Sequence, residues 1–296
     1  MGFPEAPVSL GRAGLLLTEL ATGCVTLIAP DGRIERIPTG GSPNGAAVGG
    51  DGAIYIANNG GAEYRPGHFL PIGLGTNYAG GSIQRLDLKT RELQTLYTHC
   101  DGNRLSAPND LVFDKAGGFY FTDTGKRYAR TRDHGGLYYA LADGSSIREV
   151  VYPMLTPNGV GLSPDEATLY VADMEPARLW AFDLAEPGVI RREAFPSPYG
   201  GRLVAGLGGF QRFDSLKVAA SGNICVATLV TGAVSVISPD GALHSQIETP
   251  DHFPTNICFA GGDMRTAYVT LARSGRLIRL DWFEPGLKLN FHDLWA

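Results

Sequence analysis

Six short segments of this chain each begin with a small side chain that carries oxygen. The six residues hold the same place in one recurring phrase, and they are Glu5, Asn44, Asn109, Asn158, Asp214 and Thr255. Carboxylate and amide oxygens without thiolate or imidazole suit a hard divalent cation. Ca²⁺ is favoured because it tolerates irregular geometry, and Mg²⁺, Mn²⁺ or Zn²⁺ also fit. Any one of these Asn or Asp residues alone is typical of a turn after proline. Acids in only the first and fifth copies favour a metal site instead.

The recurring phrase consists of a small polar opening, an apolar strand, a Gly/Asp turn and a second apolar strand. Its six copies are PEAPVSLGRAGLLLTEL from Pro4, PNGAAVGGDGAIYIANN from Pro43, PNDLVFDKAGGFYFTDT from Pro108, PNGVGLSPDEATLYVAD from Pro157, FDSLKVAASGNICVATL from Phe213 and PTNICFAGGDMRTAYVTL from Pro254. Further strand-like runs follow each copy, and four short antiparallel strands per unit are typical of a propeller blade. Six copies of one unit favour radial repetition over a sandwich or a pair of barrels. We therefore predict an all-β fold, a six-bladed β-propeller with four-stranded antiparallel blades around a central channel, in a single domain of residues 1–296.

Composition and charge agree with this fold and exclude several classes of partner. Among 296 residues there are 40 Gly and 19 Pro, and only 19% of residues are charged, which is typical of short strands joined by tight turns. A net charge of -5 without a run of Lys and Arg argues against binding to nucleic acid or an anionic membrane. The N-terminus lacks the pattern of a secretory signal, and no window has 18 uninterrupted apolar residues, so we expect a cytoplasmic protein. The four cysteines lack metal-ligand spacing and are expected to be free core thiols: Cys24, Cys100, Cys225 and Cys258.

The six opening residues are expected to form a ring around the channel, because the innermost strand of every propeller blade runs along it. Polar groups that point into one tunnel require water or a cation as a partner. Two carboxylates crowded in a narrow channel would force one of them to protonate, and a divalent cation removes that conflict.

Several of these segments resemble motifs of the gluconolactonase/regucalcin family, which includes diisopropyl fluorophosphatase-like and drug-responsive lactonase members. They are PEAPVSL, PNDLVFD, PNGVGLSPDEATLYVAD, FDSLKVAASGNICVA and PTNICFAGGDMRTAYVT, and the resemblance follows the blade order over nearly the whole chain. It implies one divalent metal held by Glu5, Asn158 and Asp214, with Asn109 beside the metal as a further ligand or a substrate contact. The family's EGP motif reads Glu5-Ala6-Pro7 here, which keeps the carboxylate. Glu19 is a less suitable ligand because it ends the second strand of its unit.

The resemblance also implies an activity, the opening of a small-molecule lactone by metal polarisation of the carbonyl and attack of water. Asp214 is the candidate general base, and Asn109 would orient the substrate. A serine-nucleophile motif GxSxG is absent from the sequence. Two alternatives stay open. The same site could act on an organophosphate, on an unusual cyclic ester or in a non-hydrolytic reaction, or the propeller could be a binding module without enzymatic activity.

Two long Gly-rich inserts, 58–81 and 196–213, interrupt the repeats and are interpreted as functional covers. His68 and Tyr78 of the first insert are candidate substrate-binding residues, and Phe69, Tyr199 and Phe210 either line the pocket or pack the loops. Asp123 and Asp173 close second strands and are expected to bind turn amides, although Asp123 could also approach the channel. The outer strand of the last blade could come from the N-terminal residues or from the tail KLNFHDLWA.

Overall fold

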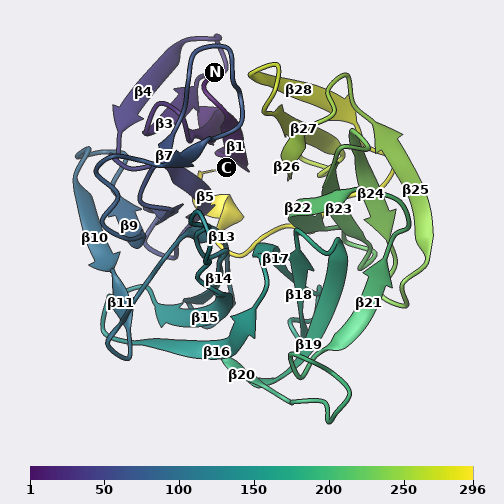
Figure 1. Cartoon of the computed structure of the whole chain (residues 1–296). Helices are drawn as coiled ribbons and strands as arrows, with labels where there is room; N and C mark the ends of the chain where they lie inside the picture. Colours follow the sequence, from purple (N-terminus) through teal and green to yellow (C-terminus); the bar gives the residue numbers. More distant parts are fainter. Residues whose placement is uncertain (296) are drawn as a thin grey trace.

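The chain forms a ring of six blades around a central channel (Figure 1), and the computed structural model describes residues 1–295. Among these residues there is no α-helix, and the only helical turns are the two short 3₁₀ segments η1 (Gly11–Ala13) and η2 (His292–Trp295). The predicted all-β, six-bladed propeller is confirmed. A helix with the length and apolar character that a membrane crossing requires is not found within 1–295.

Each blade is an antiparallel sheet whose first strand lines the channel. Blade 1 contains β1 (Pro4–Ser9), β2 (Leu15–Glu19), β3 (Cys24–Ile28) and β4 (Ile34–Pro38). Blade 2 contains β5 (Pro43–Val48), β6 (Ile54–Asn58), β9 (Ser82–Leu86) and β10 (Leu93–Tyr97). Two short hairpins accompany it, β7 (Ala62–Glu63) with β8 (Gly73–Leu74), and β11 (His99–Cys100) with β12 (Asn103–Arg104). Blade 3 contains β13 (Pro108–Phe113), β14 (Gly118–Asp123), β15 (Gly135–Leu141) and β16 (Ile147–Met154).

The second half of the ring repeats this order. Blade 4 contains β17 (Pro157–Leu162), β18 (Thr168–Asp173), β19 (Arg178–Glu186) and β21 (Arg202–Gly206), and the short β20 (Val189–Ile190) pairs with the end of β19. Blade 5 contains β22 (Arg212–Val218), β23 (Ile224–Leu229), β24 (Ala233–Ile237) and β25 (Leu243–Glu248). Blade 6 contains β26 (Pro254–Ala260), β27 (Thr266–Leu271) and β28 (Arg276–Asp281).

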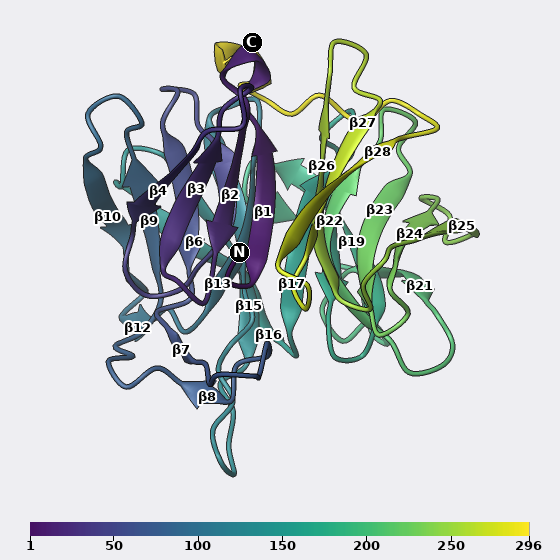
Figure 2. The same ribbon diagram turned by 90° about the horizontal axis from the view of Figure 1, so that it is seen from above.

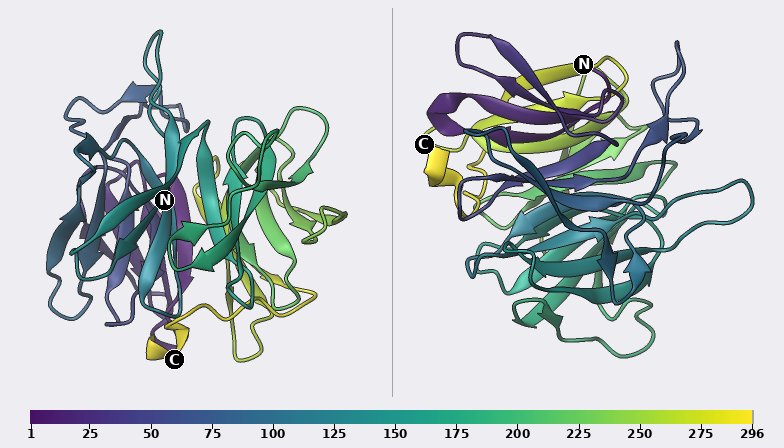
Figure 3. Two further views of the ribbon diagram at one scale, coloured as in Figure 1. Left: turned by 90° about the horizontal axis from the view of Figure 1, so that it is seen from below. Right: turned by 90° about the vertical axis from the view of Figure 1, so that its left-hand side faces the viewer.

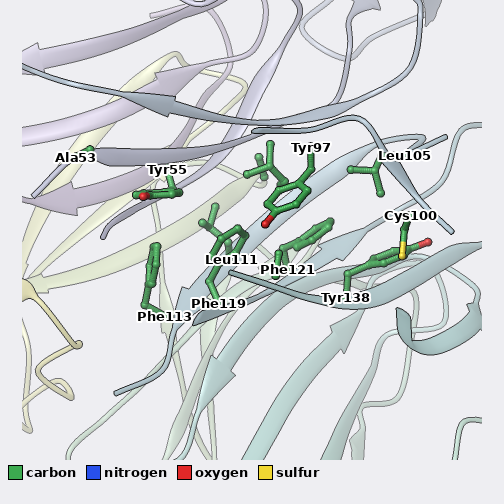
Figure 4. Packing of buried hydrophobic residues seen from close by; sticks show 13 residues of the cluster. Ala53, Tyr55, Tyr97, Cys100, Leu105, Leu111, Phe113, Phe119, Phe121 and Tyr138 are labelled. Atoms are coloured by element: carbon green, nitrogen blue, oxygen red, sulfur yellow. The ribbon is translucent and has the colours of Figure 1, made fainter. Parts of the chain in front are cut away.

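The core lies between neighbouring blades, and Figure 4 shows the part between blades 2 and 3. Inner strands such as β13 are buried along their whole length because each face packs against another blade, which explains their continuous apolar runs. Tyr55 of blade 2 meets Phe113 of blade 3 edge to face at 5.0 Å, and Phe121 stacks on Tyr138 at 5.1 Å. Aromatic contacts of this kind, between blades and within one blade, bury large apolar areas.

Every inner strand is irregular at its opening residue. The pairing with the second strand shifts register at this point in all six blades, between Glu5 and Val8, Pro43 and Gly45, Pro108 and Leu111, Pro157 and Val160, Phe213 and Leu216, and Pro254 and Asn256. A β-bulge re-aims the side chains beside it. The six irregularities therefore release the opening residues from the regular alternation of the sheet.

Two expectations about the outer strands need correction. Within residues 1–295 the last blade has three strands, and neither the N-terminal residues nor the tail pairs with β28. The ring closes through side-by-side contacts instead, since the Met1 ammonium donates to Gly275 O at 3.2 Å and Thr255 Oγ1 to Pro4 O at 2.9 Å. The 196–213 segment is only partly an insert, because it contributes β21 as the fourth strand of blade 4.

The C-terminal tail crosses the end of the channel that lies opposite the 58–81 insert (Figures 2 and 3). Asn290 Nδ2 donates to Phe113 O at 3.1 Å, and Trp295 Nε1 donates to Gly52 O at 3.1 Å, which attaches the tail to blades 3 and 2. A cavity of about 50 Å³ lies between the tail and the inner strands, lined mostly by apolar side chains and by Lys217. The channel therefore presents its opening residues toward the insert.

Candidate metal centre

The four residues predicted as metal ligands all open inner strands and are all buried. Glu5 comes from blade 1, Asn109 from blade 3, Asn158 from blade 4 and Asp214 from blade 5, and each is 2–6% exposed. The Asn158 side chain lowers the pKa of Asp214 against the effect of burial, and its Oδ1 accepts a hydrogen bond from Ser215 Oγ at 3.2 Å. The structure thus places the predicted ligands around one channel.

Threonine side chains fix the backbone of this ring. Thr18 of β2 donates through Oγ1 to Asn44 O at 2.5 Å, and Thr122 of β14 donates to Asn158 O. Each of these bonds joins the second strand of one blade to the inner strand of the next, as the bond of Thr255 to Pro4 joins blade 6 to blade 1. The opening residues are therefore held by their neighbours in the ring before any ligand binds.

Both predicted carboxylate ligands sit in an environment that disfavours their charge. Burial raises the pKa of Glu5 to about 7, against the hydrogen bonds that its Oε2 accepts from Ala6 N at 2.9 Å and Asn256 Nδ2 at 3.1 Å. Burial also raises the pKa of Asp214 well above its usual range, and the negative charge of Glu5 adds to this rise. Two buried carboxylates that repel each other in this way either hold a proton or are charged beside a positive partner.

A third carboxylate in the channel already has its partner. Asp110 follows Asn109 and is 1% exposed, and its Oδ2 accepts a hydrogen bond from Lys217 Nζ at 3.4 Å. We did not predict a role for Asp110 or Lys217, although a charged residue inside an otherwise apolar inner strand is a usable signal. Asn256, which binds Glu5, was missed as well because only the closure of the ring brings blades 6 and 1 together.

A divalent cation fits the residues that remain. With Asp110 paired to Lys217, Glu5 and Asp214 would carry two negative charges when both are ionised, which matches the charge of one such ion. The buried Asn109 Oδ1 accepts no hydrogen bond from any group in residues 1–295, so an acceptor oxygen is free to ligate. Within residues 1–295 no three His, Cys, Asp or Glu side chains are grouped closely enough to hold a metal ion by themselves. The donor set is therefore two carboxylates and side-chain amides. Such oxygen donors suit Ca²⁺ and other hard ions.

Comparison with known proteins identifies the family. A family model described as SMP-30/Gluconolactonase/LRE-like region matches residues 3–273. The chain belongs to this family. A gluconolactonase from Zymomonas mobilis is 26% identical over 279 residues, covering 88% of this chain and 70% of that protein. A lactonase drp35 from Staphylococcus saprophyticus is 31% identical over 240 residues, covering 81% of this chain and 67% of that protein. The resemblance inferred from the motifs is thereby confirmed.

Solved structures support the fold of this SMP-30/gluconolactonase-like chain. A gluconolactonase from Xanthomonas campestris superposes with a TM-score of 0.74 at 22% identity, over 95% of this chain and 86% of that one. Regucalcin from Agrobacterium tumefaciens, described as a calcium-binding protein, superposes with a TM-score of 0.75 at 21% identity, over 98% and 95%. At these identities the similarity establishes the propeller architecture.

In this SMP-30/gluconolactonase-like chain, the acidic residues that end the second strands of blades 1, 3 and 4 hold the segments that lead into the inner strands of the same blades. Glu19 accepts hydrogen bonds from Gly2 N at 2.6 Å, Thr26 Oγ1 at 2.6 Å and Arg36 Nε at 2.9 Å, so its carboxylate is fully engaged. Asp123 accepts from three backbone amides, and Asp173 accepts from Thr156, in agreement with the turn-amide interpretation. Glu19 is therefore an anchor for the segment that leads into Glu5.

The candidate substrate-binding residues of the 58–81 insert lie at different depths. His68 is exposed, whereas Tyr78 is half-buried and donates its hydroxyl to Ser106 O at 2.7 Å. Lys126 of blade 3 ties the base of the insert to the ring, donating to Asn59 Oδ1 at 3.2 Å and Gly61 O at 3.1 Å. Its ammonium also lies 5.0 Å from the centre of the Tyr78 ring. The insert is thus attached to blade 3 as well as to its own blade.

Proposed function

We propose that the protein hydrolyses lactones at one divalent cation, with Ca²⁺ preferred, held by Glu5, Asn158 and Asp214 with Asn109 beside it. One observation carries the proposal. The channel contains two buried carboxylates without a counter-charge and an amide oxygen without a partner. The substrate class is supported by relatives named gluconolactonase and lactonase, and the choice of Ca²⁺ by the calcium-binding regucalcin neighbour.

The residues of the channel have distinct parts in such a reaction. A bound divalent cation supplies Lewis acidity to an ester carbonyl and lowers the pKa of water. Asp214 would accept the proton of the attacking water on a carboxylate oxygen. The Asn109 amide orients the ester, and the threonine bonds to the ring backbone keep this geometry fixed before the substrate arrives.

Chelation and reconstitution test the proposal. The purified protein is stripped with a chelator and assayed on aldonolactones and aromatic lactones with Ca²⁺, Mg²⁺, Mn²⁺ or Zn²⁺ restored. We expect one metal ion per chain, loss of turnover on stripping and recovery on reconstitution. Turnover of organophosphates but of no lactone would assign the site to the alternative electrophile, and no turnover with any metal would refute the proposed function.

A matched pair of variants separates the ligands from the rest of the ring. Asp214→Ala removes a proposed ligand, so metal affinity and lactone turnover are both expected to fall by about a hundredfold. Asn44→Ala truncates a buried ring residue of blade 2 that is outside the proposed ligand set, and it should retain the metal. Equal metal loss in both variants would contradict the ligand assignment.

A further inference from the structure

The 58–81 insert covers the end of the channel where the opening residues lie. It leaves blade 2 after β6, and Figure 1 shows it passing over blade 1 toward blade 6. Phe69 near its tip packs edge to face against Phe253, which precedes β26, with ring centres 4.7 Å apart. The ring of Tyr64 packs against that of Phe3, two residues before Glu5, with ring centres 6.2 Å apart. One loop therefore contacts the two blades whose junction carries Glu5.

The hydroxyl of Tyr64 is a second feature of the insert. Its phenolic oxygen is buried and has no hydrogen-bond partner anywhere in residues 1–295. Burial raises the pKa of Tyr64, and the negative charge of Glu5 adds to this rise.

An unpaired buried hydroxyl is unusual because it loses its hydrogen bonds to water without a replacement. The paired tyrosines of this chain show the ordinary situation. Tyr97, in the outer strand of the same blade, donates its hydroxyl to Leu141 O at 2.7 Å and to Ser146 O at 2.8 Å. A donor that is held unpaired beside a proposed reaction centre is matched to a group that arrives with a ligand.

We propose that Tyr64 contacts the substrate, donating a hydrogen bond from its hydroxyl to an oxygen atom of a cyclic ester bound beneath the insert. This inference rests on the proposed function for the class of ligand. Tyr64 then adds a contact from the insert to those of Asn109 and the metal ligands in the channel, so that the ester is held between the ring and its cover. The contact explains why a loop that is distant in sequence from the ligands reaches across the ring to Glu5.

The test deletes single hydroxyl groups from the Ca²⁺-loaded full-length protein. Tyr64→Phe should lower kcat/KM on the best lactone by about tenfold or more, the effect of one lost hydrogen bond to bound substrate, with metal content unchanged. Its Tm should equal or exceed that of the wild type, because no protein partner is lost. Tyr97→Phe, the matched control, should lower the Tm and leave kcat/KM within about twofold, since its hydroxyl serves the fold.

Binding of the unreactive analogue D-gluconolactam, measured by calorimetry, separates this inference from the proposed function. If the wild type turns over a lactone and Tyr64→Phe stays within about twofold of its kcat/KM, Tyr64 does not contact substrate. If the wild type turns over no substrate, the proposed function fails, and the binding of D-gluconolactam alone then tests the role of Tyr64. Binding that Tyr64→Phe weakens by about tenfold upholds the contact, whereas unchanged binding, or none to the wild type, overturns it.

Discussion

Replacement of Glu19 by glutamine should lower both the stability of the fold and the affinity of the proposed metal site. Glu19 is buried in blade 1 and accepts hydrogen bonds from Gly2 N, Thr26 Oγ1 and Arg36 Nε. The bond to Gly2 holds the segment that leads directly into Glu5. Glu19→Gln keeps the size of the side chain while removing its charge, so the change isolates the electrostatic part of this anchor.

The expected loss follows from the three bonds. A hydrogen bond to a charged acceptor contributes about 1 kcal/mol more than one to a neutral acceptor. The bonds from Gly2 and Thr26 lie in buried or half-buried surroundings and should show this difference. The Arg36 side chain is 49% exposed, so water screens most of its share. The free energy of unfolding at pH 7 should therefore fall by roughly 2 kcal/mol.

The effect should also depend on pH with a definite sign. Burial alone would raise the pKa of Glu19, but the hydrogen bonds from Thr26, Gly2 and Arg36 outweigh burial and hold it below 4.5. A carboxylate with a lowered folded-state pKa stabilises the protein above its unfolded-state pKa and loses that contribution as the pH falls through the folded-state value. The gap between wild type and Glu19→Gln should therefore narrow as the pH is lowered below 4.5.

Urea titrations over this pH range measure the gap, and calorimetric Ca²⁺ titrations measure the metal site. Asn58→Ala is the control, because Asn58 Oδ1 holds Ser42 N at 3.0 Å in blade 2 in the way that Glu19 holds Gly2. Both variants should lose stability, and only Glu19→Gln should bind Ca²⁺ more weakly. A stability gap that is absent at pH 7 or constant down to acid pH, or equal Ca²⁺ affinity in both variants, would refute this reasoning.

Three further perturbations address other parts of the molecule. Lys217→Met leaves the Asp110 carboxylate buried without its partner and should lower the free energy of unfolding by about 3 kcal/mol at pH 7, measured by urea titration. The double variant Lys217→Met/Asp110→Asn should recover most of this loss, and an unchanged urea midpoint for Lys217→Met would contradict the pairing. Burial, opposed by the charge of Asp123, lowers the pKa of Lys126 to about 8. Between pH 8 and pH 10.5 the unfolded protein therefore binds one proton more than the folded protein. Wild-type stability should then rise relative to Lys126→Met over that interval, by up to about 1.4 kcal/mol per pH unit, and a difference that stays flat with pH would count against it. Phe69→Ala removes the aromatic contact between the insert and Phe253 at the start of blade 6, and it should speed amide hydrogen exchange in 58–81 by up to about tenfold while exchange in the blades stays constant. If the insert exchanges at the same rate in the variant and the wild type, the contact does not hold the insert in place.

The sequence predicts the blades well because one phrase recurs, and each copy contains its own two strands and turn. Glu5, Asn109, Asn158 and Asp214 open inner strands as the register required. Strand β21 was interpreted as part of an insert, since RLVAG stands alone between Gly-rich stretches and gains its strand character only by pairing with β19. Local pattern is therefore sufficient for the inner strands and insufficient for the outer strand of blade 4.

Contacts between distant blades set the limit for the site. Asp110 and Lys217 lie in blades 3 and 5, and no local pattern indicates that their side chains meet in the channel. Asn256 reaches Glu5 only because the last blade closes against the first. The position of Tyr64 depends on the path of a loop that has little regular structure of its own. Each of these residues acquires its role from the closed ring, which the spacing of residues in one repeat cannot describe.

We expect the junction between blades 6 and 1 to open first under denaturing conditions. As at the other junctions, no strand is shared across this one in residues 1–295, and here the two blades come from opposite ends of the sequence. The bonds between them include those from Met1 to Gly275, Thr255 to Pro4 and Asn256 to Glu5. Opening the ring there moves Glu5 away from the other opening residues while every blade keeps its own sheet. Inactivation should therefore precede unfolding, so that mild denaturant abolishes function in a molecule that is still almost entirely β-sheet.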